Sequence, residues 1–344
     1  MNLITIGMID MPSTPVSWLL FMLCMAFIGV AGVRLIRCGD AIAGHTGLSR
    51  GWIGLILVAT VTSLPELVTG LSAVTMARAP NMAVGDVLGS CVFNLAILAV
   101  VDVAHRQGPL YGVIDPGHLL SASFGVVLLA AAALVLVLET QGLLPRLGHV
   151  SMGSVALLAL YGLALRAIYQ AEQRQRPQSP AERPTLSLKA AISGYALAAA
   201  VILACGVALP LIGVELAARM GWSHSFFGTL FIAMATSVPE LATTWGALRI
   251  GAPDIAVANL LGSNLFNLTI LALDDLAWLP GSLYASVAPV HTVSALTACL
   301  MSGAVVVALA VRPAARVRHI GSWASVVLLG LYLLNAVLQF RHGH

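Results

Sequence analysis

Two copies of one short phrase place an acidic residue inside an apolar run. The first copy is Thr62-Ser63-Leu64-Pro65-Glu66, and the second is Thr236-Ser237-Val238-Pro239-Glu240. An ionisable side chain at bilayer depth costs at least about 2.5 kcal/mol, so an acid in such a place is a candidate functional residue. The carboxylates of Glu66 and Glu240, together with the hydroxyl groups beside them, are the kind of oxygen ligand that binds a hard cation.

The prolines predict further oxygen ligands. A proline inside a helix displaces the carbonyl four residues before it, so Pro65 and Pro239 should free the carbonyls of Val61 and Ala235. In a membrane, irregular backbone is tolerated only where it is buried in protein or lines a cavity. Each phrase is therefore expected to break its helix near the bilayer midplane. Calcium would use six to eight of these oxygens, and sodium could use smaller sets of them.

The spacing from Ser63 to Glu66, and from Ser237 to Glu240, also fits a capping box, in which the Glu satisfies a backbone donor at the start of a helix. A cap alone leaves the cost of a buried acid unexplained. Two copies at membrane depth therefore favour ion binding, and a cap can coexist with it.

The repeat extends beyond the phrase and adds a second polar set. Residues 59–98 align with 233–271 with one gap, and 20 of the 40 positions are identical. Because Asp86, Ser90 and Asn94 are spaced at i, i+4 and i+8, they share one helix face. Their counterparts in the second copy are Asn259, Ser263 and Asn267. The neighbouring glycines, Gly89 and Gly262, fit a role in close helix packing. The side chains expected to line the ion site are those of Ser90, Asn94, Ser263 and Asn267.

Composition identifies a polytopic membrane protein. Hydrophobic residues make up 59% of the chain and charged residues 9%, and the mean hydropathy is +0.95, whereas soluble domains carry about 25% charged residues. Ten apolar runs are long enough to cross a bilayer. They cover about 15–36, 51–77, 81–104, 116–139, 149–169, 188–212, 224–250, 253–273, 286–311 and 320–340. The N-terminal residues carry no Lys or Arg, so the first run is expected to be a retained helix and not a signal peptide.

The spans fall into two groups of five. We expect a first half over 1–170 with its repeat at about 51–104, a cytoplasmic linker over 171–187, and a second half over 188–344 with its repeat at about 224–273. Of the 17 Lys and Arg residues, 13 lie after the odd-numbered spans. By the positive-inside rule both termini are extracytoplasmic, and an odd number of spans per half makes the repeats inverted. The net charge of +3 reflects these loops and does not indicate nucleic-acid binding.

Cysteine and histidine give no sign of a resident metal centre. The five cysteines lie within or at the ends of apolar runs, and no pair has metal-cage spacing or an evident disulfide partner. The nine histidines are scattered and form no pair at helical spacing.

The pattern of Thr-Ser-x-Pro-Glu, then Ala-Pro, then Gly-Ser-x-x-Phe-Asn, present in both halves, resembles the two alpha repeats of the cation/calcium exchanger superfamily, and most closely its sodium/calcium exchanger branch. The resemblance covers effectively the whole chain. It implies a ten-helix antiporter with four ion sites clustered between the halves and no cofactor. By position, Glu66 and Glu240 would be the main calcium ligands. The calcium and sodium sites would be completed by Thr62, Ser63, Thr236, Ser237, Ser90, Asn94, Ser263 and Asn267, with the carbonyls of Ala59 and Ala233.

Three departures from the family pattern affect four positions. The Gly that usually precedes Thr-Ser is Val61 in one copy and Ala235 in the other. Many relatives carry Asp at the position of Asn267, and Asp86 stands where Asn is usual. These changes bear on the stoichiometry, the electrogenicity and the counter-ion, but they leave both Glu residues in place.

The sequence thus predicts an all-α antiporter of the inner or plasma membrane that exchanges calcium for sodium by alternating access. The nearest alternative keeps the fold and uses protons in place of sodium, with Glu66, Glu240 or Asp86 as the proton carrier. A cation channel would form a continuous pore from the same polar centre. An intramembrane enzyme would need a nucleophile or a His set, and no such set accompanies the Glu residues. No Walker-type nucleotide loop is present, which argues against a primary pump.

Overall fold

The computed structural model describes residues 13–46, 62–105, 108–175, 186–249, 251–313, 315, 317 and 321–342. Eight helices in these ranges are long and apolar enough to cross a membrane. They are α1 (Thr14–Thr46), α5 (Pro80–Ala104), α7 (His118–Thr140), α8 (Met152–Gln175), α9 (Leu188–Met220), α13 (Pro253–Ala277), α14 (Val290–Val311) and α15 (Trp323–His342). The chain is therefore a polytopic helical membrane protein, as its composition predicts.

A ninth span is broken in the middle. It comprises α10 (His224–Phe227), the π-helical turn η2 (Gly228–Ile232), α11 (Ala233–Thr236) and α12 (Val238–Arg249), and it bends by 44° at Ser237. The expected span 51–77 is represented by α4 (Leu64–Thr75), because its first part lies outside the described residues. Nine of the ten expected spans thus have a helical counterpart, and the other is described from Thr62 onward.

Local sequence explains several helix ends. Pro80 and Pro253 occupy the first turns of α5 and α13, where a missing backbone N–H costs nothing. The Ser187 side chain accepts a hydrogen bond from the Ala190 N–H at the start of α9. Gly221, in the left-handed region at φ 67°, ends the same helix. The expected end of this span at residue 212 is too early, because Pro210 lies inside the helix and does not stop it.

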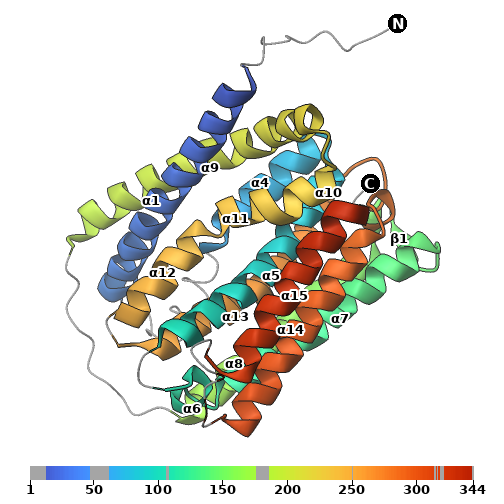
Figure 1. Ribbon diagram of the computed structural model, residues 1–344. Helices are drawn as coiled ribbons and strands as arrows, with labels where there is room; N and C mark the ends of the chain where they lie inside the picture. Colours follow the sequence, from blue (N-terminus) through green and yellow to red (C-terminus); the bar gives the residue numbers. More distant parts are fainter. Residues whose placement is uncertain are drawn as a thin grey trace, which may run out of the picture.

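The helices form a central bundle and a separate pair (Figure 1). The bundle has α5 and α13 at its centre, and α7, α8, α14 and α15 pack around them. In the most apolar 18-residue stretches of α5 and α13, 78% and 83% of the residues are buried. The pair consists of α1 and α9, which lie against each other along one side. In the most apolar 18-residue stretch of each of these two helices, only 33% of the residues are buried. From this pair, α1 contacts α11 and α12, and α9 contacts α4 and α10.

Two buried aspartates at equivalent places tie the halves together. Asp102 follows Asn94 by eight residues on α5, and Asp275 follows Asn267 by eight on α13. Asp102 accepts hydrogen bonds from Leu110 N (2.7 Å), from Ser322 N (2.6 Å) and from Ser325 Oγ (2.5 Å) at the start of α15. In this way a carboxylate of the first half caps the last helix of the second half.

Asp275 makes the matching contacts in the opposite sense. It accepts from Leu283 N (2.8 Å), from Ser151 N (2.9 Å) and from Ser154 Oγ (2.6 Å) at the start of α8. The short elements at the bundle ends accompany these contacts. They are α6 (Leu110–Val113), the 3-10 turn η3 (Tyr284–Ser286), and the antiparallel strands β1 (Arg146–Leu147) and β2 (Val150–Ser151). This reciprocity supports the expected organisation as two related halves.

Candidate cation-binding site

In both phrases the Ser has dihedral angles outside the helical region. Ser237 has φ −84° and ψ 10° between α11 and α12, and Ser63 has φ −87° and ψ 11° immediately before α4. The prediction that each phrase breaks its helix is confirmed at the second copy. At the first copy, the residues before Thr62 lie outside the described ranges. The Ser63 side chain makes no capping bond to α4, so the serine half of the expected capping box does not form there.

The two Ser side chains instead reach the Glu of the opposite repeat. The Ser237 hydroxyl lies 3.1 Å from Glu66 Oε1, and the Ser63 hydroxyl lies 3.5 Å from Glu240 Oε1. Each Glu therefore has a hydroxyl oxygen of the opposite half beside it. Ser263 on α13 adds a hydroxyl 3.3 Å from Glu240 Oε1, and Ser90 on α5 lies 3.1 Å from the Ser237 hydroxyl.

The threonines extend the same set but make different contacts. The Thr62 hydroxyl lies 3.1 Å from the Ser263 hydroxyl. The Thr236 hydroxyl instead lies 3.0 Å from Asp86 Oδ1, so Asp86 contacts the second phrase. The counterpart of Asp86 is Asn259, whose amide lies 3.4 Å from the Thr244 hydroxyl, farther along α12.

An asparagine that the sequence reasoning passed over lies at the centre. Asn264 on α13 accepts from Asn94 Nδ2 at 3.0 Å and donates to the Cys91 carbonyl at 3.1 Å. Because Cys91 and Asn264 are the equivalent positions that follow Ser90 and Ser263, their contact lies where the two repeats meet. The sequence signal for this residue was an Asn directly after Ser263 within an apolar run. It was missed because the matching residue of the first repeat is Cys91, so the amide does not recur.

The site contains more buried acceptors than donors. Oxygens without a hydrogen-bond partner include Glu66 Oε2, Glu240 Oε2, Asp86 Oδ2, Asn94 Oδ1 and Asn267 Oδ1. All five residues are buried. Among the described residues none of the three carboxylates pairs with a basic side chain. A cation bound among these oxygens would satisfy acceptors whose burial is otherwise costly.

The ligand types suit a hard cation. The described residues contain no group of three or more His, Cys, Asp or Glu side chains arranged around a metal. A cation near Glu66 or Glu240 would therefore take its remaining ligands from hydroxyl, amide and carbonyl oxygens, which calcium and sodium accept.

A close backbone contact holds α5 against the broken span. A Cβ atom at Gly89 would lie 2.3 Å from the Thr229 carbonyl oxygen, and one at Gly228 would lie 2.6 Å from the Met82 carbonyl oxygen. Only glycine permits such an approach. The expected packing role of Gly89 is confirmed, and the contact holds Ser90 next to the break at Ser237.

The structure brings most of the expected site residues together. Buried side chains around the two breaks come from Thr62, Ser63, Glu66, Asp86, Ser90, Asn94, Thr236, Ser237, Glu240, Ser263 and Asn267. The Ala233 carbonyl accepts from Ser237 N at 3.1 Å and lies 3.5 Å from the Ser90 hydroxyl. Ala59 and Val61 lie outside the described residues.

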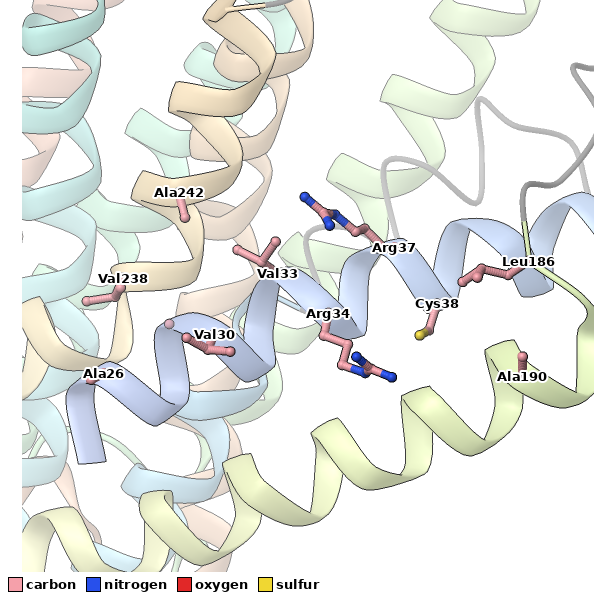
Figure 2. A pocket seen from close by; sticks show the side chains of 11 residues that line it. Ala26, Val30, Val33, Arg34, Arg37, Cys38, Leu186, Ala190, Val238 and Ala242 are labelled. Atoms are coloured by element: carbon pink, nitrogen blue, oxygen red, sulfur yellow. The ribbon is translucent and has the colours of Figure 1, made fainter. Parts of the chain in front are cut away.

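A cleft of about 720 Å³ lies elsewhere, between α1, α12 and the start of α9 (Figure 2). Apolar residues such as Val30, Val238 and Ala242 line it, together with Arg34 and Arg37. It has no carboxylate in its lining, and the two guanidinium groups repel cations. The cleft is therefore not the cation site, although it borders the helix that carries Glu240.

Comparison with known proteins identifies the family of this chain. Residues 16–170 and 190–341 match the model of a family described as sodium/calcium exchanger protein. A curated relative, the putative antiporter CaxA of Alkalimonas amylolytica, is 29% identical over 245 residues, which cover 68% of this chain and 72% of CaxA.

Two types of solved exchanger share the fold. The sodium-calcium exchanger NCX_Mj, soaked with Na+ and Sr2+, matches with a TM-score of 0.61 and 20% identity over 94% of this chain and 99% of NCX_Mj. The H+/Ca2+ exchanger CAX matches with a TM-score of 0.69 and 14% identity over 94% of this chain and 81% of CAX.

The family match spans both halves, including each Glu phrase and the helix that faces it. Members of this family are ion transporters and not enzymes, and they transport calcium and other cations without a cofactor. The chain belongs to the sodium/calcium exchanger protein family and is a cation antiporter of the cation/calcium exchanger superfamily.

Proposed function

We propose that this protein exchanges calcium for sodium by alternating access, with Glu66 and Glu240 as the principal calcium ligands. The observation that carries the proposal is the reciprocal contact at the two breaks. Each Glu is fully buried, contacts a Ser of the opposite repeat and keeps a free Oε2. One carboxylate from each half gives two negative charges, which match the charge of one calcium ion.

The remaining ligands would come from both halves. Thr62, Ser63, Thr236, Ser237, Ser90, Asn94, Ser263 and Asn267, with the carbonyls of Ala59 and Ala233, would complete the calcium and sodium sites. Asp86 would supply a third carboxylate beside Thr236. At Asn267, where many relatives carry Asp, the amide oxygen would serve as a neutral ligand.

The helix pair α1 and α9 is suited to change access to the site. A Cβ at Gly32 of α1 would lie 2.5 Å from the Pro239 ring, and one at Gly206 of α9 would lie 2.8 Å from Val68 on α4. Each helix of the pair thus packs closely on the half-helix that carries the Glu of the opposite repeat. Movement of the pair along the bundle would open the site to one side and then to the other.

The test is calcium uptake into proteoliposomes with imposed sodium, proton or potassium gradients. The proposal expects uptake driven by an outward sodium gradient, with no calcium conduction in its absence. Uptake that ignores the sodium gradient would contradict sodium coupling. Gradient-independent conduction would indicate a channel.

Proton coupling is the second candidate. It is favoured by the similarity to CAX and by Asp86, a third fully buried carboxylate that no basic group of the described residues neutralises. In the same assay, an inward calcium flux driven by an outward proton gradient would support it.

The orientation in the membrane is a separate part of the proposal. Both termini and Arg146 are expected outside, with Arg176 and Arg316 in the cytoplasm. Arg176 and Arg316 lie outside the described ranges. Single-cysteine labelling with an impermeant reagent, in a background that lacks the native cysteines, tests this. Termini on the same side as the linker would overturn the span count and the inverted repeat.

A further inference from the structure

Asp274 is a fully buried carboxylate outside the set of expected ligands. It lies on α13 seven residues after Asn267, which places it on a similar face and about 10.5 Å farther along the helix. Neither carboxylate oxygen accepts a hydrogen bond from any residue that the structure describes. This distinguishes it from its neighbour Asp275, whose oxygens accept three hydrogen bonds.

The Asp274 carboxylate lies against a glycine of the half-helix that carries Glu66. A Cβ at Gly70 would lie 2.5 Å from Asp274 Oδ2 and 2.8 Å from Oδ1. Because Gly70 follows Glu66 by four residues on α4, the two residues share one helix face. Any displacement of α4 against α13 therefore changes the surroundings of this carboxylate directly.

Within the part of the chain that the structure describes, no positive charge faces Asp274. The elements packed against this end of α13 contribute Glu66 on α4, Asp86 on α5, Glu139 on α7, Tyr284 in η3 and His149 in the β1–β2 turn. Glu139 is neutralised by Arg146 at 2.7 Å. His149 contacts the Leu276 carbonyl instead.

The other basic groups of the packed elements lie toward the opposite end of α13. His118 on α7 contacts Asp254 in the first turn of α13, Arg249 ends α12 just before that turn, and Arg166 lies three turns beyond the Ser154 that contacts Asp275. Asp274 thus has neither a cation nor a donor among the described side chains to stabilise its negative charge.

A lone carboxylate in such a place is either protonated or bound to a cation. Calcium requires six to eight oxygens, and the carboxylate has no hydrogen-bonded hydroxyl or amide beside it. A proton needs only one oxygen. We propose that Asp274 is a proton-binding residue that holds a proton while α4 packs against it, and releases that proton to water when movement of α4 exposes it.

This inference rests on the proposed exchange at Glu66 and Glu240 and adds a proton-coupled step to it. The first repeat has Val101 at the matching position, which is buried and apolar. Proton binding at this depth therefore belongs to one half only, so the two directions of transport would differ in their dependence on pH.

The first experiment tests protonation without relying on transport. Infrared spectra are recorded at pH 7 for the purified full-length wild type and for Asp274→Asn. The wild-type spectrum should contain the carbonyl band of a neutral carboxylic acid, and the variant should lack that band. The band should shift in D2O. A spectrum without such a difference would overturn the inference, whether or not the protein exchanges calcium.

The second experiment measures calcium uptake and internal pH together in proteoliposomes. Asp274→Asn should keep calcium uptake within about twofold at pH 7, because the central ligands remain, but it should lose calcium-coupled proton movement and flatten the pH profile. Asp274→Glu keeps an acid and should restore both. Asp254→Asn removes a half-exposed acid from the same helix and should leave both unchanged.

The outcomes separate the two proposals. If Asp274→Asn moves as many protons per calcium as the wild type with the same pH profile, or if the wild type moves none, Asp274 is not a coupling residue. If the wild type transports calcium with no gradient, the exchange proposal fails, while the infrared result still decides whether Asp274 holds a proton. If Asp274→Asn does not fold, the wild type is compared with Asp274→Glu. If these two proteins show the same infrared acid band but move different numbers of protons per calcium, the inference is overturned.

Discussion

The two Glu phrases and the two helices that face them differ in how well they keep the repeat symmetry. The phrases break at the same Ser with nearly the same dihedral angles, and each Ser reaches the Glu of the other half. The facing helices have diverged: Asp86 stands opposite Asn259 in the alignment, and Cys91 opposite Asn264. Each half therefore contributes one buried Glu carboxylate, whereas the polar side chains around these carboxylates distinguish the halves.

The largest effect is expected at the symmetric pair. Glu66→Gln and Glu240→Gln each keep the size of the side chain and remove its charge. Loss of a buried charged partner costs about 3 kcal/mol or more, so calcium uptake should fall by at least about 100-fold in each variant. Uptake and calcium binding in proteoliposomes measure this.

A surface acid provides the control for that pair. Glu215→Gln removes the partly exposed partner of Arg219 on α9, and transport should remain near the wild-type rate because ion pairs near the surface contribute little. Wild-type rate and affinity in Glu66→Gln alone, or in Glu240→Gln alone, would show that the two halves do not share the site equally.

The second prediction concerns stability at the matched aspartates. The carboxylates of Asp102 and Asp275 each accept three hydrogen bonds. Asp102→Asn and Asp275→Asn each replace the carboxylate with an amide, whose NH2 group cannot accept from these N–H and O–H donors. Each should lower the free energy of unfolding by about 2 to 3 kcal/mol. Thermal unfolding in detergent measures this, with Asp254→Asn as the control. Unequal losses would show that the halves are not tied together symmetrically.

Sequence reasoning was most successful where one property repeats. Nine of the ten apolar runs, the break at Ser237 and the polar face of α5 follow from hydropathy, proline chemistry and helical spacing. It could not find the Asn94–Asn264 bond or the Asp102 and Asp275 caps, because these depend on which helices of opposite halves become neighbours. Nor could spacing alone show that Ser63 contacts Glu240 and does not cap its own helix.

The third prediction tests whether the asymmetric residues share one charge balance. Asp86 contacts Thr236, and Asn267 has both amide atoms free. Asp86→Asn and Asn267→Asp should each change the sodium and calcium concentrations needed for half-maximal calcium uptake by about tenfold, which corresponds to about 1.4 kcal/mol. The double mutant should recover part of the loss if the positions are coupled. Strictly additive effects, or no effect of Asp86→Asn, would remove Asp86 from the mechanism.

The smallest effect is expected at Asn264, where the repeats meet. Asn94 donates to Asn264, which leaves Asn94 Oδ1 free for an ion, so Asn264 fixes which atom of the Asn94 amide faces the site. Asn264→Ala removes that acceptor and allows the amide to rotate. One net hydrogen bond contributes about 0.5 to 1.5 kcal/mol, so the calcium KM should rise by about threefold to tenfold with little change in kcat.

Two variants distinguish positioning by Asn264 from simple packing around it. Asn264→Asp keeps an acceptor for Asn94 and should preserve the calcium KM better than Asn264→Ala does, even though it loses the donor to the Cys91 carbonyl. Cys91→Ser changes the partner position while keeping its backbone carbonyl, and it should leave the KM close to the wild-type value. If Asn264→Asp and Asn264→Ala raise the KM equally, the contact between the repeats serves packing, and the asymmetry of the facing helices reaches the ions only through Asp86 and Asn267.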